Sequence, residues 1–269
     1  MTNNHVAVFI LILGVLFLAA TILFSPPSVS PPTPIVEEPK GTANMDNLRF
    51  SNTMEWNPEL LAIRRLPSAQ ASDFAERISI MPPPANSSEE TRRELDLLIS
   101  YKALRTEEKV AEVKREINIH GAIIDGRPMS DYLDTKQYPV AGRVFGEALR
   151  DIGTVALILK EKYDRVRPSI LRPEIDPGIE VPGHPAYPSG HSTEAHMMAF
   201  LLAEIMPEKT EIFMRDAGAI AKNREIIGVH YPSDSAAGLE TARQFMELLR
   251  QDSKFQKELP RMREELRQK

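Results

Sequence analysis

Apolar residues recur every three or four positions through most of the chain after residue 44, which is typical of amphipathic helices. This pattern predicts long helices over residues 140–163, 192–205, 210–227 and 234–249. Convincing alternation of apolar and polar residues, which would indicate half-buried strands, is absent. We therefore expect residues 45–269 to form one all-α domain, a helical bundle of about six to eight helices.

Two helix starts can be placed more closely from capping residues. Ser87 and Glu90 fit a capping box, which would open a helix that runs to about Arg105. Thr106 is a suitable N-cap for the next helix, in which apolar residues such as Val113 recur at helical spacing.

The amino terminus has a different character. Residues 6–24 contain no charged side chain, and this length meets the requirement for a membrane-spanning helix. We expect residues 1–24 to be an uncleaved anchor, because no Lys or Arg precedes the apolar run and Ser25-Pro26 is a poor cleavage site. A cleaved signal peptide is the alternative. Residues 25–44 are rich in proline and predict an extended linker.

Composition narrows the function without identifying it. Hydrophobic residues make up 42% and charged residues 26% of the chain, as in a folded globular protein. The formal net charge is -5, so no basic excess points to nucleic acid as a partner. The absence of cysteine excludes disulfides, thiolate metal sites and a cysteine nucleophile.

The first stretch with candidate chemistry joins two cations. Lys160 and Arg167 lie seven residues apart, so a helix that continued through both would present them on one face until Pro168 ended it. Two cations on one face suit an anion. A solvated basic surface is the alternative for this stretch taken alone.

The second stretch contains Ser189, Gly190 and His191 directly before an apolar helix. The start of a helix offers free backbone N–H groups and the positive end of the helix dipole. Gly190 would allow an oxyanion to approach the main chain, with His191 beside it. A capped helix start with an incidental histidine is the alternative.

The third stretch contains Arg224, His230 and Asp234. Gly228 would let the chain turn between Arg224 and His230, and Pro232 is compatible with the first turn of the next helix. Asp234 would then lie within hydrogen-bonding reach of His230 and orient its ring. A surface His–Asp pair is the alternative.

Together, the three stretches match in order and spacing a three-part signature: Lys-x6-Arg-Pro, Pro-Ser-Gly-His and Arg-x5-His-x3-Asp. The chain thus resembles the type 2 phosphatidic acid phosphatase superfamily over roughly residues 75–250. It is most similar to the class A bacterial non-specific acid phosphatases, whose proline-rich entry resembles residues 81–85. Asn223 departs from the pattern, because the family usually has Ser before the third-motif arginine.

The resemblance implies the acid phosphatase/vanadium haloperoxidase fold and a metal-independent hydrolysis of phosphomonoesters through a phosphohistidine intermediate. His230 would be the nucleophile, His191 the acid and base, and Asp234 the group that orients His230. The phosphate would be bound by Lys160, Arg167, Ser189, Gly190 and Arg224. No cofactor and no metal are implied.

Several alternatives remain open on these residues. A vanadium-dependent haloperoxidase would use the same side chains for vanadate as its cofactor, with His230 as the axial ligand. A lipid phosphate or diphosphate phosphatase, an inactive membrane-tethered binding protein and a metal site of His184, His191 and His196 are further alternatives. Vanadate could also act only as an inhibitor.

The expected partners are a small phosphorylated substrate and the membrane, which residues 6–24 would enter. The class A relatives also suggest a homo-oligomer. We expect a bacterial inner-membrane protein with its catalytic domain in the periplasm or outside the cell; secretion to the periplasm after signal cleavage is the alternative.

Overall fold

A computed structural model describes residues 45–116, 127–133 and 136–267, which belong to one compact unit of the chain, residues 39–269. These described residues contain helices and no strand, so the all-α prediction is confirmed for them. The α-helices are α2 (Pro58–Arg65), α3 (Ala69–Arg77), α4 (Glu89–Ser100), α5 (Glu107–Arg115), α6 (Pro139–Tyr163), α7 (Pro168–Leu171), α8 (Gly190–Ile205), α9 (Thr210–Ile226), α10 (Pro232–Gln251) and α11 (Ser253–Arg267). Short 3-10 helices lie at η1 (Met45–Asn47), η2 (Phe50–Asn52), η3 (Tyr101–Leu104), η4 (Pro128–Tyr132), η5 (Pro173–Ile175) and η6 (Pro207–Lys209).

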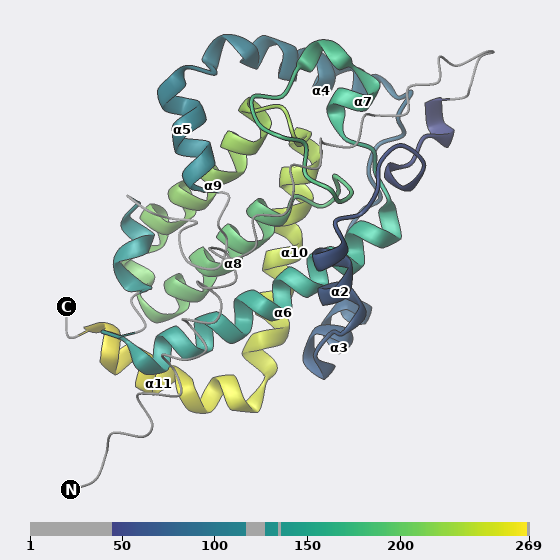
Figure 1. Ribbon diagram of the computed structural model, residues 1–269. Helices are drawn as coiled ribbons and strands as arrows, with labels where there is room; N and C mark the ends of the chain where they lie inside the picture. Colours follow the sequence, from purple (N-terminus) through teal and green to yellow (C-terminus); the bar gives the residue numbers. More distant parts are fainter. Residues whose placement is uncertain (1–44, 117–126, 134–135, 268–269) are drawn as a thin grey trace, which may run out of the picture. The chain divides into compact units, whose positions relative to one another are not determined.

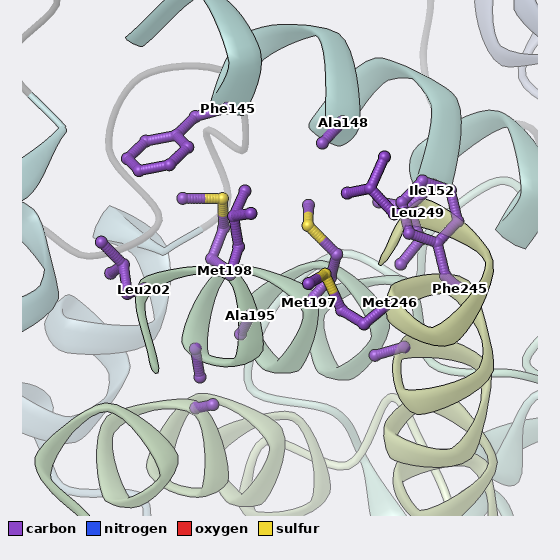
Figure 2. Packing of buried hydrophobic residues seen from close by; sticks show 14 of the residues in the cluster. Phe145, Ala148, Ile152, Ala195, Met197, Met198, Leu202, Phe245, Met246 and Leu249 are labelled. Atoms are coloured by element: carbon purple, nitrogen blue, oxygen red, sulfur yellow. The ribbon is translucent and has the colours of Figure 1, made fainter. Parts of the chain in front are cut away.

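Helix α8 is the centre of the bundle. It packs against α6, α9 and α10, and the ribbon in Figure 1 shows it among these three helices. Apolar residues occur all round α8 rather than on one stripe, as expected for a helix with neighbours on every side. Figure 2 shows Met197 and Met198 of α8 in one buried cluster with Ile152 of α6 and Phe245 of α10. This buried framework holds the start of α8 in a fixed position.

The long helices lie where the periodicity placed them. Helix α6 begins one residue before the predicted 140–163 and α9 ends one residue before the predicted 210–227. Helices α8 and α10 each begin two residues earlier than predicted, because Ser189 is the N-cap of α8 and Pro232 occupies the first position of α10. Both shifts bring motif residues into the first helical turn.

The number of helices was underestimated, since the described residues form ten α-helices rather than six to eight. The additional elements include the short α2, α3 and α7, together with α11, which has Pro260 in its interior. Short helices offer few periods to recognise, and a proline inside a helical pattern ordinarily predicts its end.

The capping prediction for α4 was wrong by one residue. Ser88, not Ser87, accepts the backbone N–H of Thr91 at 3.1 Å. Ser87 instead binds Asp46, to which its backbone N–H and its hydroxyl donate at 2.8 and 2.6 Å. The predicted cap at Thr106 is confirmed, because its hydroxyl oxygen accepts the N–H of Lys109.

The predicted anchor of residues 6–24 and the linker of residues 25–44 lie outside the described residues. Within 45–116, 127–133 and 136–267, no helix combines the length and the apolar character needed to cross a bilayer.

Candidate active site

The three sequence motifs converge on one pocket of about 1090 Å³. Lys160 enters it from the end of α6, Gly190 and His191 from the start of α8, Arg224 from the end of α9, and His230 from the turn before α10. Residues from distant parts of the chain therefore share one cavity, as the motif pattern predicted. Further out, apolar side chains of α2 and α6 line the pocket, among them Leu60, Ile63, Leu149 and Leu157.

Lys160 is buried and held by backbone oxygens. Its Nζ donates to the carbonyls of Pro185, Ala186 and Pro188 at 2.8, 3.2 and 2.5 Å. These carbonyls belong to the segment that leads into α8, so the ammonium group fixes that segment against α6. Burial, followed by the nearby Arg167, holds the pKa of Lys160 well below its usual value.

The prediction that one helix carries both Lys160 and Arg167 was wrong. Helix α6 ends at Tyr163, and Asp164 adopts a left-handed conformation with φ 46° while its N–H donates to the carbonyl of Lys160. Arg167 is the N-cap of the separate helix α7, and Pro168 begins that helix instead of ending α6. The backbone reverses direction at Asp164, a residue type that tolerates this conformation.

Arg167 is fully buried and makes its hydrogen bonds within the protein. Nε donates to the carbonyl of His184 at 3.0 Å, and Nη1 donates to the carbonyl of Val229 at 2.7 Å. Nη1 also lies 3.1 Å from Nε2 of His230, and Nη2 lies 3.0 Å from Nδ1 of His184. Arg167 therefore connects the loop before α8 to the turn before α10. Burial lowers its pKa to about 9.

Hydrogen bonds of Ser189 hold the start of α8 in place. Ser189 is fully buried, and its hydroxyl oxygen accepts the N–H of Ser192 at 3.4 Å as the N-cap. The backbone N–H of Ser189 donates to the carbonyl of Asp234 at 3.0 Å, which joins the starts of α8 and α10. Gly190 lies beside Lys160: a Cβ built on Gly190 would stand 3.9 Å from Lys160 Cε.

The turn between Arg224 and His230 depends on Gly228, as the sequence predicted. Gly228 has φ +87°, a conformation that side chains disfavour, and a Cβ there would stand 2.7 Å from Nη2 of Arg105. Arg105 donates from Nε to the carbonyl of Ile226 at 2.6 Å. A side chain far away in the sequence thus holds the turn that sets Arg224 and His230 facing the same pocket.

His230 and Asp234 form the predicted pair, with Nδ1 of the histidine 3.0 Å from Oδ2 of the aspartate. Arg167 can only donate, so Nε2 of His230 must accept its hydrogen bond and Nδ1 must carry the proton. Burial, together with the cations Arg167 and Lys160, lowers the pKa of His230 well below 6.5. The imidazole is accordingly neutral, with an unprotonated nitrogen at the pocket.

A buried carboxylate network supports Asp234, and the sequence did not reveal it. Arg165 donates to Oδ1 of Asp234 at 2.6 Å and to Oε2 of Glu94 at 3.2 Å. Its guanidinium also lies 3.7 Å from the ring centre of Tyr231. Arg165 stands two residues before Arg167 in the first motif, but nothing in the sequence pairs it with Glu94, some seventy positions upstream.

Arg224 differs from the other cations of the pocket. It is only 1% exposed, yet its Nε and Nη1 have no hydrogen-bond partner among the described residues. Burial lowers its pKa to about 10, and the carboxylate of Glu116 acts in the opposite direction. A buried guanidinium with N–H groups left over is a binding group for an oxyanion.

His191 lies in the same pocket and is held by the main chain. Its Nε2 donates to the carbonyl of Glu116 at 3.0 Å, which leaves Nδ1 as the basic nitrogen of the neutral ring. Burial, followed by the charge of Arg224, lowers the pKa of His191 well below 6.5. An anion bound beside it would raise that pKa again.

Asn223 has a structural role in the position where the family usually has Ser. Its Nδ2 donates to Oε1 of Glu112 at 3.0 Å and to Oε1 of Glu116 at 2.9 Å, and its Oδ1 accepts from Lys109 at 3.1 Å. Arg127 binds the same two carboxylates. The amide supplies two donors and one acceptor to this cluster, more than a hydroxyl could provide.

The alternative metal site of His184, His191 and His196 finds no support in the geometry. His184 binds Arg167, His191 binds the carbonyl of Glu116, and His196 lies 3.1 Å from the hydroxyl of Ser192. Among the residues that the structure describes, no group of three or more His, Asp or Glu side chains is arranged to hold a metal ion.

Comparison with known proteins assigns this pocket to a class. Residues 144–245, which carry all three motifs, match the family model of the PAP2 superfamily. This match confirms the resemblance inferred from the motifs. The fold agrees: a bacterial vanadium-dependent iodoperoxidase superposes with a TM-score of 0.50 at 20% identity, over 72% of this chain and 57% of that chain.

Bacterial acid phosphatases are among the similar curated sequences. A non-specific acid phosphatase of Salmonella typhimurium is 34% identical over 116 residues, which cover 41% of this chain and 46% of the relative. An acid phosphatase of Zymomonas mobilis is 26% identical over 204 residues, which cover 70% of this chain and 74% of the relative. The chain spans about half the length of the first of these relatives.

Proposed function

We propose that this protein is a metal-independent acid phosphatase that hydrolyses phosphomonoesters through a phosphohistidine intermediate. One observation carries the proposal: Arg224 is buried with two N–H groups that no described residue accepts, in a pocket shared with Lys160 and a neutral His230. The acid phosphatases among the similar sequences support the same activity.

In the first step, Nε2 of His230 attacks phosphorus and the bond from phosphorus to the ester oxygen breaks. Asp234 holds the proton on Nδ1, so Nε2 is the unprotonated nitrogen. Its lone pair accepts the hydrogen bond of Arg167 in the structure and becomes available for attack when Arg167 donates to the phosphate instead. Lys160, Arg167 and Arg224 stabilise the charge on the non-bridging oxygens.

The leaving alkoxide needs a proton, and we assign its delivery to His191. Since Nε2 of His191 is bound to Glu116, Nδ1 is the nitrogen that would take up a proton when the phosphate dianion binds and then pass it on. In the second step, His191 accepts a proton from water, the oxygen of that water attacks phosphorus, and the bond to His230 breaks. Inorganic phosphate and free enzyme result.

The experiment is a steady-state assay of the full chain with p-nitrophenyl phosphate at pH 5 to 7, with and without EDTA. We expect turnover that EDTA leaves unchanged and a phosphoenzyme that quenching in alkaline detergent traps in the wild type but not in His230→Ala. Loss of turnover with EDTA, restored by a divalent ion, would contradict metal independence.

The same donors would fit vanadate, an oxyanion of similar shape, so the assay needs a second arm. Wild-type protein loaded with vanadate is tested for oxidation of iodide and bromide by hydrogen peroxide. Halide oxidation without hydrolysis of any phosphomonoester would replace the phosphatase proposal with that of a haloperoxidase.

We further propose that residues 6–24 attach the protein to the bacterial inner membrane, with the catalytic domain in the periplasm. The length and apolar character of this segment support the proposal. Fractionation of expressing cells tests it: the full chain should sediment with membranes, whereas a chain that begins at residue 45 should not. Sedimentation of both forms would place the attachment elsewhere.

A further inference from the structure

One polar group in the pocket has no role in the chemistry above. Glu194 lies on α8 one turn after Gly190 and lines the same pocket as Lys160 and His230. It is only 7% exposed, and its Oε2 is buried with no hydrogen-bond partner among the described residues. A buried carboxyl oxygen without a partner is costly, so a binding function at this point is a natural explanation.

The opposite wall of the pocket makes room for this carboxyl. A Cβ built on Gly153 of α6 would stand 3.2 Å from Oε1 of Glu194, closer than most side-chain contacts allow. Glycine inside a helix costs about 0.5–1 kcal/mol relative to alanine. Gly153 therefore leaves space for the carboxyl group of Glu194 at some cost to the stability of helix α6.

The chemistry of Glu194 indicates what it would recognise. Burial raises its pKa to about 8, although the charge of Lys160 acts in the opposite direction. At neutral and acidic pH the side chain is thus an uncharged acid with one O–H donor and one carbonyl acceptor. Such a pair complements an alcohol hydroxyl, which also donates and accepts, whereas an alkyl chain would leave both groups without partners.

We propose that Glu194 is a specificity-determining residue whose carboxyl group hydrogen-bonds hydroxyls of the leaving group, so that the site prefers phosphate esters of polyols to those of simple alcohols. This inference rests on the proposed phosphatase function. Thr154 and Asp151, on the α6 wall of the same pocket, add polar groups for a hydroxylated substrate.

The test compares glycerol 1-phosphate with propyl phosphate, which has the same carbon chain without the two hydroxyls. The readout is the ratio of the two kcat/KM values. We expect Glu194→Leu to lower this ratio roughly fivefold, the loss of about one hydrogen bond. Glu194→Gln keeps a donor and an acceptor in the same shape and should keep the ratio within about twofold.

Gly153→Ala gives an independent variant, because its new methyl group would displace the carboxyl without removing it. The helix should become slightly more stable, so a reduced ratio could not be attributed to unfolding. We expect the ratio to fall in this variant too.

An equal loss for both substrates in Glu194→Leu would overturn the proposal and leave a packing role. Selective loss of 2-aminoethyl phosphate in Glu194→Gln would also overturn it, because that result marks a carboxylate for ammonium groups. If the wild type hydrolyses propyl phosphate but shows no preference for glycerol 1-phosphate, only the specificity inference fails. If it hydrolyses no phosphomonoester at all, the phosphatase function fails and the inference with it.

Discussion

Two buried arginines, Arg224 in the pocket and Arg167 behind His230, use their hydrogen bonds in opposite ways. Arg167 binds the carbonyls of His184 and Val229 and contacts the rings of His184 and His230. Arg224, equally buried, leaves Nε and Nη1 without a partner among the described residues. One guanidinium is thus built into the framework, while the other is kept for a ligand.

The difference shows that charge alone does not define a binding group. Arg224 lines the pocket and Arg167 contacts His230, which also lines it, so both carry charge that would attract an oxyanion. Arg167 also fixes His230, the proposed nucleophile, because its Nη1 selects the tautomer of His230 together with Asp234. Removing Arg167 should therefore alter the protein itself, whereas removing Arg224 should alter mainly what the protein binds.

The largest expected effect comes from His230→Ala, which removes the group that both arginines serve. We expect kcat to fall on the order of 10⁵-fold, as for other enzymes that lose a nucleophile. Vanadate binding, followed by calorimetry, should persist because Lys160 and Arg224 remain. His196→Gln is the matched control, a buried α8 histidine that we expect to retain activity within about threefold; comparable losses in both would show that the bundle, not the nucleophile, is affected.

Asp234→Asn should come next, with a loss of kcat of about 10³- to 10⁴-fold. The amide can present its N–H to Nδ1, which would move the proton of His230 to Nε2 and block attack. Arg165 would also lose a charge partner in the interior, so the melting temperature should fall. Activity close to that of the wild type would show that the His230 tautomer does not depend on Asp234.

The arginine comparison itself is tested by Arg224→Gln and Arg167→Gln. We expect kcat/KM to fall about 10²- to 10³-fold in both variants, as when one oxyanion donor is removed. Only Arg167→Gln should also lower the melting temperature by several degrees, because it breaks hydrogen bonds between two loops. Differential scanning calorimetry provides the readout, and equal melting temperatures would remove the distinction between the two residues.

A pH profile sharpens the comparison further. Attack requires a neutral His230, and burial with the neighbouring cations lowers its pKa well below 6.5. The acid limb of kcat/KM should therefore lie below pH 6.5. In Arg224→Gln one cation is gone, so the limb should move to higher pH. An unchanged limb in that variant would mean that Arg224 exerts no field on the two histidines.

The same pKa shifts predict how stability depends on pH. The folded protein keeps His191 and His230 neutral, while the unfolded chain binds protons at an ordinary pKa near 6.5. Below that pH the unfolded state holds more protons, so these groups make the protein less stable as the pH falls. The melting temperature should therefore fall as the pH is lowered below 6.5, and it should fall less with phosphate present, since a bound anion favours the charged histidines. An equal fall with and without phosphate would argue against anion binding between His191 and His230.

The smallest effect is expected for Asn223→Ser, which restores the residue usual in the family. Its amide binds the carboxylates of Glu112 and Glu116, and none of these three residues lines the pocket, so kcat/KM should change less than about threefold. The lost hydrogen bonds should lower stability by about 1 kcal/mol. A large change in KM would instead assign Asn223 to substrate binding.

The residues that line the pocket could be predicted from the sequence more fully than the buried residues that hold them in place. Lys160, His191 and His230 could be predicted because a local spacing pattern carries them. Glu94 and Arg165 could not, since their contact joins segments about seventy residues apart and each looks like an ordinary surface charge in its own window. The hydrogen bond between His191 and the carbonyl of Glu116 likewise depends on tertiary packing alone.

The fold shows the same division between local and long-range information. Periodicity found α6, α8, α9 and α10, whose apolar residues face a common core. It placed the end of α6 at Tyr163, but it gave no sign of the turn that keeps the helix from continuing to Arg167. Distant residues fix that turn: the backbone N–H of Phe50 donates to the carbonyl of Asp164 at 3.0 Å, and that of Ser51 donates to its carboxylate at 3.1 Å. The periodicity of residues 140–163 carries no information about partners as distant in the sequence as Phe50 and Ser51.

The tight bend at Gly228 has a practical consequence for anyone who wishes to move this chemistry into another scaffold. The bend is clamped by Arg105, which donates to the carbonyls of Ile226, Ile175 and Asp176. Residues 223–234 grafted alone into another helical bundle would lack the hydrogen bonds of Arg105, and Arg224 and His230 would no longer be held at the same pocket. A grafted site should work only if Arg105 is grafted as well. The smallest set of residues that can be transferred therefore comes from separate segments of the chain.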